Sequence, residues 1–206
     1  MIEKVKQENY FFYNMVKVKR NLREVLFPEL TMRKTHLIAL IAILAAVSNA
    51  IMFLSFPITL LGITSKIHFI QIPILTAAFG IGPFAGLLVG IIGAISMVFS
   101  VIPPNPFIVL YNGLLGFFAG IIYLILRRIR IHKLLAQVSA MAVAFLIQMP
   151  FIWTLNTIVM GIPSSVVQVI LIKLLLEDLA STLINHPILY RINLVNAGRG
   201  NKIESK

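Results

Sequence analysis

Long apolar segments follow one another along this chain, with only short polar connections between them. Hydrophobic residues make up 59% of its 206 residues and charged residues 12%, about half the charged share of a soluble domain. A helix of about 20 apolar residues is long enough to cross a bilayer. We therefore expect an all-α membrane protein with six transmembrane helices in one bundle. The predicted helices are residues 36–56, 67–80, 82–102, 107–126, 134–160 and 166–189.

Prolines and glycines mark the connections between these segments. The second segment is the shortest and contains Pro73. Residues 103–106, Pro-Pro-Asn-Pro, separate the third and fourth segments, because helices rarely continue through such a sequence. We expect residues 57–66 to form a loop and residues 161–165 a tight connection. The predicted organisation is a basic N-terminal segment at 1–34, a transmembrane domain at 35–190 and a polar tail at 191–206.

The N-terminal segment mixes basic residues with apolar ones. Phe11, Phe12, Met15 and Leu22 recur at roughly helical spacing among its lysines and arginines. This pattern is typical of a basic amphipathic helix lying on an anionic membrane surface, and Pro28 would end it. A flexible basic tail is the other interpretation. The segment lacks the early apolar core of a signal peptide.

The basic residues are distributed unevenly between the two sides of the predicted bundle. Sixteen of the 18 lysines and arginines lie in residues 1–34, 127–133 and 191–206, which six spans place on one side. The positive-inside rule then puts both termini in the cytoplasm. The net charge of +11 is thereby explained by orientation and lipid attraction, and nucleic acid is not an expected partner.

Small residues recur at every third or fourth position in three segments, which permits close helix packing in lipid. The glycine rows are Gly82, Gly86 and Gly90, and Gly113, Gly116 and Gly120. The alanine row is Ala42, Ala46 and Ala50. We interpret the glycine rows as packing within the bundle. The alanine row either packs inside or forms an outward face for a partner, and spacing alone leaves this open.

Few ionisable residues fall within the predicted spans, where such residues often mark functional sites. Lys173 precedes Glu177 by four residues, so the two can pair on one helix face. Asp178 points about 100° away from Glu177 around the helix and needs a partner of its own. Lys173 and Lys66 would suit a carboxylate or phosphate ligand, whereas Glu177 and Asp178 would suit a cation. The sequence does not decide between these two sets.

Polar side chains gather toward the outer half of the last three segments, and together they suit a small polar heterocycle. Trp153, the single tryptophan, is either a stacking platform or a residue of the interfacial belt. The candidate substrate-binding residues are Lys66, His68, Asn105, Tyr111, Asn112, Gln148, Trp153, Asn156, Gln168, Lys173 and Glu177.

Motifs for catalysis are absent from the sequence. It contains no P-loop, no H-E-x-x-H, no G-x-S-x-G and no cysteine. Its four histidines lie far apart, without metal-ligand spacing. We therefore expect a binding protein rather than an enzyme, with no cofactor and no metal.

The pattern resembles the substrate-binding (S) components of energy-coupling factor (ECF) transporters. Residues 67–93 are similar to the family's short proline-containing helix, Gly-Pro turn and glycine-stepped helix, and Ala42-x-x-x-Ala46 resembles its alanine motif. The resemblance implies a multi-pass protein of the cell membrane that binds a water-soluble vitamin or related micronutrient. A transmembrane coupling (T) subunit, contacted through the alanine motif, and two ATPase subunits would then drive uptake. The chain begins Met1-Ile2 and not Met-His, which argues against a nickel or cobalt substrate.

A stand-alone secondary transporter or channel for a small polar solute is the alternative function. It would require an ion-coupling residue within the membrane, and Asp178 is the candidate.

Overall fold

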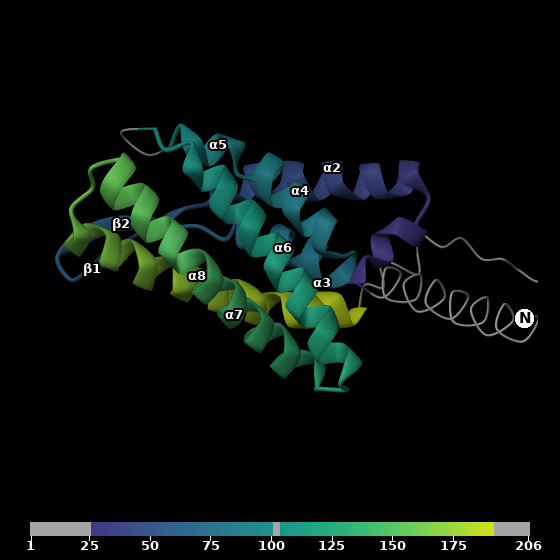
Figure 1. Ribbon diagram of the computed structural model, residues 1–206. Helices are drawn as coiled ribbons and strands as arrows, with labels where there is room; N and C mark the ends of the chain where they lie inside the picture. Colours follow the sequence, from purple (N-terminus) through teal and green to yellow (C-terminus); the bar gives the residue numbers. More distant parts are fainter. Residues whose placement is uncertain (1–25, 101–103, 192–206) are drawn as a thin grey trace, which may run out of the picture.

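A computed structural model describes residues 26–100 and 104–191 as a bundle of helices with one hairpin (Figure 1). The predictions for residues 1–25 and 192–206 lie outside the described residues. The elements are η1 (Pro28–Thr31), α2 (Lys34–Ile51), β1 (Phe56–Leu60), β2 (Ile63–Ile67), α3 (Gln71–Gly80), α4 (Pro83–Gly93), α5 (Ile95–Val98), α6 (Phe107–Arg128), α7 (Lys133–Thr154), η2 (Leu155–Val159) and α8 (Ser164–Arg191).

Most helices begin and end within a few residues of the boundaries predicted for the apolar segments. Pro73 is the third residue of α3, and proline is tolerated there because the first turn of a helix lacks acceptors for its N–H groups. The third segment divides into α4 and α5 at Ala94. Pro150 lies inside α7, which continues into the π-helical turn η2. A proline inside a helix removes one backbone hydrogen bond and clashes with the carbonyl four residues earlier, so helices are often kinked at such sites.

Residues 57–66, predicted as a loop, form most of an antiparallel hairpin instead. Phe56 pairs with Ile67, and Leu60 pairs with Ile63. The turn residues Leu61 and Gly62 have φ of 50° and 80°, and a tight hairpin turn with two positive φ values matches the twist of the strands. Leucine is uncommon in this conformation, so residues 61 and 62 do not form a typical hairpin-turn motif. In Figure 1 the hairpin lies at one end of the bundle, beside the connection between α7 and α8.

The glycine rows bring α4 and α6 into close contact, which confirms their predicted role in packing. A Cβ atom added to Gly86 would lie 2.6 Å from the carbonyl oxygen of Gly116. No side chain fits at such a crossing, so the two backbones touch directly.

Helix α2 packs against α3 and α4 at the edge of the bundle. Ser48 donates a hydrogen bond from Oγ to the carbonyl of Ile70 at 3.0 Å. Asn49 donates to the carbonyl of Ile92 at 2.9 Å and accepts from the Ser96 amide at 3.0 Å. These bonds fix the rotation of α2 about its own axis.

A carboxylate from the segment before α2 holds the start of α4. Glu29 is buried, and its Oε1 accepts a hydrogen bond from the Phe84 amide at 2.8 Å. A carboxylate at a helix N-terminus is favoured by the helix dipole. Burial nevertheless raises the pKa of Glu29, while its hydrogen bonds to backbone amides oppose that shift. Phe27 stacks on Phe84 with ring centroids 4.8 Å apart. A hydrogen bond and an aromatic contact therefore hold η1 against the start of α4.

Three helices of the described residues are long and apolar enough to cross a membrane by length and composition: Lys34–Ile51, Phe107–Arg128 and Lys133–Val159. Helices α3 and α4 are apolar but shorter. Helix α8 is the longest, and it carries Lys173, Glu177 and Asp178.

Candidate substrate-binding site

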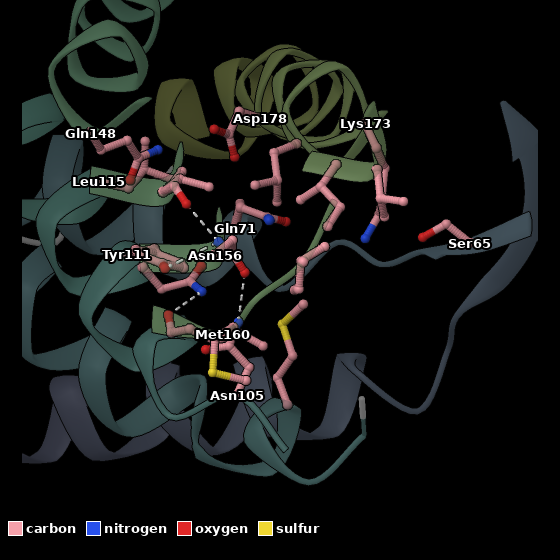
Figure 2. Close-up of a pocket in the computed structure, with 18 residues that line it drawn as sticks. Ser65, Gln71, Asn105, Tyr111, Leu115, Gln148, Asn156, Met160, Lys173 and Asp178 are labelled. Atoms are coloured by element: carbon pink, nitrogen blue, oxygen red, sulfur yellow. Dashed lines mark hydrogen bonds between the residues drawn. The ribbon is translucent and has the colours of Figure 1, made fainter. Parts of the chain in front are cut away.

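A cavity of about 360 Å³ lies between β2, α3, α6, α7 with η2, and α8. This volume is at the lower end of the usual range for small-molecule sites, roughly 300–1,000 Å³. Apolar side chains such as Met97, Leu115 and Ile152 supply much of its wall. Its polar lining residues are Ser65, Gln71, Asn105, Tyr111, Asn112, Gln148, Asn156, Lys173 and Asp178 (Figure 2).

Asn156 is the centre of a hydrogen-bond network on one side of the cavity. It accepts a bond from Asn105 Nδ2 at 3.0 Å, and its own Nδ2 donates to Tyr111 Oη at 3.1 Å. The same Nδ2 donates to the carbonyl of Ile152 at 2.7 Å. Because Asn156 lies in the π-helical turn η2, the altered helical register directs its amide toward α6. Such turns are frequent at functional sites.

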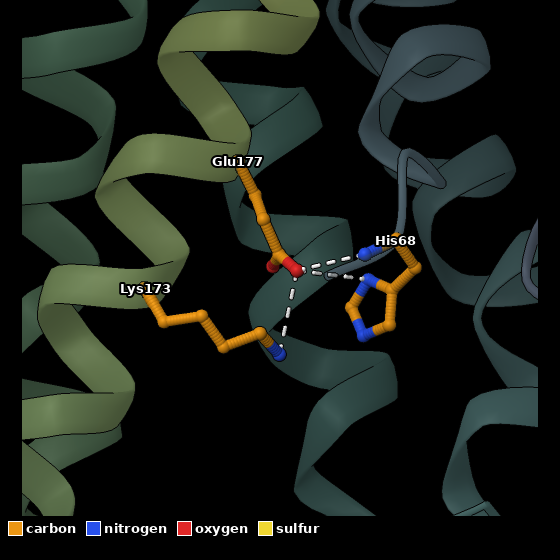
Figure 3. A network of polar contacts seen from close by, with 3 residues as sticks. All are labelled: His68, Lys173 and Glu177. Atoms are coloured by element: carbon orange, nitrogen blue, oxygen red, sulfur yellow. Dashed lines mark hydrogen bonds and ion pairs between the residues drawn. The ribbon is translucent and has the colours of Figure 1, made fainter. Parts of the chain in front are cut away.

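The predicted pair between Lys173 and Glu177 is present, and it has a third member (Figure 3). Lys173 Nζ lies 3.4 Å from Glu177 Oε1. The same oxygen accepts a hydrogen bond from the backbone amide of His68 at 2.9 Å, and His68 Nδ1 lies 3.5 Å away. Glu177 thus joins α8 to the segment between β2 and α3, and it holds Lys173 at the cavity wall.

Three buried oxygen atoms at the cavity have no hydrogen-bond partner among the described residues. They are Gln71 Oε1, Gln148 Oε1 and Asp178 Oδ1. The three residues are at most 3% exposed and come from α3, α7 and α8. Buried polar atoms are nearly always hydrogen-bonded, so unpaired ones require an explanation.

The structure brings together six of the 11 predicted substrate-binding residues at the cavity: Asn105, Tyr111, Asn112, Gln148, Asn156 and Lys173. His68 and Glu177 lie behind Lys173. Lys66 and Gln168 are exposed, and Trp153 packs against the apolar cluster that contains Met141 and Phe145.

Three polar lining residues were missing from the predicted set: Ser65, Gln71 and Asp178. Gln71 is the first residue of α3, and its place in the sequence suggested only the outer mouth of the bundle. Asp178 was recognised as lacking a partner, but its direction around α8 was not known from the sequence. Polar residues are rare in these apolar segments, and this rarity could have identified Gln71 and Asp178 as candidates.

The alanine row lies on the outer face of α2. Ala42, Ala46 and Ala50 are all exposed, whereas Ala45 is 1% exposed. The large side chains beside the row, Ile43 and Val47, are exposed as well. The row is therefore not used to pack α2 against the rest of the bundle.

The family model for the substrate-specific component of ECF transporters matches residues 36–192. The chain belongs to this family. A solved structure of the S component of a bacterial ECF transporter is similar in fold, with a TM-score of 0.52 and 18% sequence identity, over 77% of this chain and 93% of that one. No curated protein sequence matches the chain.

As an ECF S component, the chain is a helical membrane protein that serves as the substrate-specific part of a transporter. Family membership implies association with an ECF module and a small-molecule substrate, and S components are transport-binding subunits rather than enzymes. Within the described residues there is no cluster of three histidine, aspartate or glutamate side chains that could hold a metal ion.

Proposed function

We propose that this S component captures a water-soluble vitamin or related micronutrient in the cavity at the hairpin end of the bundle. The observation that carries the proposal is the cavity itself. It combines an apolar wall with polar groups from four helical elements, as small-molecule sites usually do. A T subunit and two ATPase subunits then drive release of the substrate into the cytoplasm.

The charge distribution supports an orientation with the cavity near the outer face of the cell membrane. Helix α6 ends with Arg127 and Arg128, and the connection to α7 contains Arg130. This end of α6 and the connection lie at the end of the bundle opposite the hairpin (Figure 1). Basic connections are retained in the cytoplasm. In the proposed topology, six segments within residues 35–190 cross the membrane, and residues 1–34 and 191–206 are cytoplasmic.

The site residues divide into three groups under this proposal. The six predicted residues at the cavity, together with Gln71 and Asp178, contact the substrate. Glu177 and His68 position Lys173. Lys66 and Gln168, which are exposed, would meet the substrate only as it enters.

The outward face formed by Ala42, Ala46 and Ala50 is the proposed contact with the T subunit. Small side chains allow another helix to approach closely in lipid, and all three are exposed. The lipid-facing position of the row makes this contact available without any rearrangement of the bundle.

Reconstitution in liposomes tests the proposal. The chain is purified, and the small molecules that co-purify with it are identified by mass spectrometry. Uptake of the identified compound is then measured with the chain alone and with its T and ATPase subunits, with and without ATP. We expect uptake only for the complete complex with ATP, and an ATPase-inactive complex is the control. Uptake by the chain alone without ATP would instead support the stand-alone transporter.

A further inference from the structure

The charges beside the cavity are not balanced within the described residues. Lys173 is matched by Glu177, whose Oε1 also accepts the His68 amide hydrogen. Asp178 follows Glu177 directly, but its carboxylate faces the cavity from another side of α8. One buried carboxylate is therefore left over when both acids are ionised. A buried charge without a partner is costly.

The Oδ1 atom of Asp178 has no donor within the part of the chain that the structure describes. The residue itself is 1% exposed. Ser181, three residues further along α8, has a buried hydroxyl that is likewise unpaired, so the two do not satisfy each other. An unpaired hydrogen-bond acceptor therefore lies at the cavity wall.

Two amide oxygens lie around the same part of the cavity. Gln71 Oε1 and Gln148 Oε1 are buried and unpaired. Figure 2 shows Gln148 and Asp178 toward one end of the pocket and Asn105 toward the other, with Gln71 between them. A glutamine amide can turn to present its NH₂ group, whereas a carboxylate offers oxygen in either orientation. Asp178 therefore fixes the polarity required of a ligand, and Gln148 can adapt to it.

The polar groups at the other end of the cavity are already used. The Nδ2 group of Asn105 donates to Asn156, and the Nδ2 group of Asn156 donates to Tyr111 and to Ile152. The main unmet requirement of the cavity is thus for hydrogen-bond donors beside Asp178.

We propose that the substrate carries a nitrogen-based donor group at its buried end: an ammonium, an amidinium or an amino-substituted heteroaromatic ring. This group donates to Asp178, and Gln71 and Gln148 accept its remaining N–H bonds. A charge-assisted bond of this kind is roughly twice as strong as a neutral one. A substrate that presents a phosphate or carboxylate at this end would face Asp178 and be rejected. The inference rests on the proposed function, because it assigns the chemical class of the substrate for that cavity.

Two probes of the same ring size and opposite polarity test the proposal. The full chain in lipid nanodiscs is titrated with benzamidine and with benzoate, and binding is measured by calorimetry. We expect benzamidine to bind and benzoate not to bind. Asp178→Asn should weaken benzamidine binding at least about tenfold, as expected for loss of one charged partner. Stronger binding of benzoate, no binding of benzamidine, or unchanged binding by Asp178→Asn overturns the proposal.

A second measurement needs no ligand and uses neighbouring carboxylates as a matched pair. Asp178→Asn removes a carboxylate without a partner, whereas Glu177→Gln removes one that holds Lys173 and His68. The thermal unfolding midpoint of the empty chain should stay equal or rise for Asp178→Asn and fall for Glu177→Gln. A lower midpoint for Asp178→Asn shows a protein partner and refutes the assignment. Binding of benzamidine without ATP-driven uptake by the complex would leave this inference standing while the proposed function fails.

Discussion

Replacing Ala46 with leucine separates the proposed partner face from the folding of the bundle. Ala46 is exposed on α2, and its neighbour Ala45 is 1% exposed and packs toward α4. A Cβ atom added to Gly93 of α4 would lie 3.5 Å from Ala45 Cα and 2.6 Å from Ser48 Cβ. Leucine has no room at position 45, whereas at position 46 it extends into lipid. Ala45→Leu is therefore the matched control.

The expected magnitudes follow from this difference in packing. Overpacking at Ala45 costs about 1–3 kcal/mol, which lowers the unfolding midpoint by roughly 2–12 °C for a protein of this size. At Ala46 an outward substitution changes the free energy of unfolding by less than about 0.5 kcal/mol. If a T-subunit helix packs on Ala46, the same overpacking penalty weakens the complex by roughly 5- to 150-fold.

Two assays on the same preparations distinguish an effect on the bundle from an effect on partner binding. Thermal unfolding of the isolated chain reports on the bundle, and co-purification with the T and ATPase subunits reports on the partner face. We expect Ala46→Leu to keep the unfolding midpoint and lose the complex, and Ala45→Leu to lose stability. An undiminished yield of the complex with Ala46→Leu would refute the partner face. An equal loss of stability in both variants would refute the orientation of α2.

Three further predictions concern the inside of the molecule. Because burial raises the pKa of Glu29, the folded state holds this proton at pH values where the unfolded chain has lost it. Stability should therefore fall as the pH rises through that window, and Glu29→Gln should flatten the pH dependence of the unfolding midpoint. Asn156→Ala leaves its partners unpaired and should cost about 1–3 kcal/mol and weaken retention of the co-purified small molecule. Trp153→Phe, which lies outside the cavity lining, should leave that retention unchanged in the same mass-spectrometric assay. Replacing either Lys173 or Glu177 alone with an apolar residue should cost about 3–5 kcal/mol, and replacing both should cost much less. Additive losses in a double-mutant cycle of unfolding free energies would contradict the buried pair.

Much of the helix arrangement was predictable because the apolar segments have the length that a bilayer requires. The predicted segments at 107–126 and 166–189 became α6 and α8 within a few residues. The hairpin was not predictable in the same way, since Leu61 adopts a positive φ that its sequence does not favour. The break at Ala94 between α4 and α5 also has no strong local signal, because most of the surrounding residues are apolar.

The site was only partly predictable, because helical periodicity places a residue around its own helix but not relative to other helices. Spacing alone indicated that Lys173 and Glu177 can pair. It did not reveal that Glu177 also binds the His68 amide, 109 residues away in the chain. Gln71 likewise reaches the cavity only because α3 packs against α6 and α8.

The sequence by itself determined the class of protein, the uneven distribution of basic residues along the chain and the existence of an alanine row. These properties depend on composition and on short-range spacing. The tertiary structure decided how each helix is rotated toward its neighbours. That rotation exposes Ala46 while it buries Ala45, pairs Lys173 with Glu177, and leaves Asp178 facing the cavity without a partner. The physical reason is that close packing and hydrogen bonds join distant segments. Examples are the bonds of Ser48 with Ile70, directly before α3, and of Asn49 with Ile92 in α4. Such contacts determine which face of each helix is buried, and a one-dimensional pattern does not.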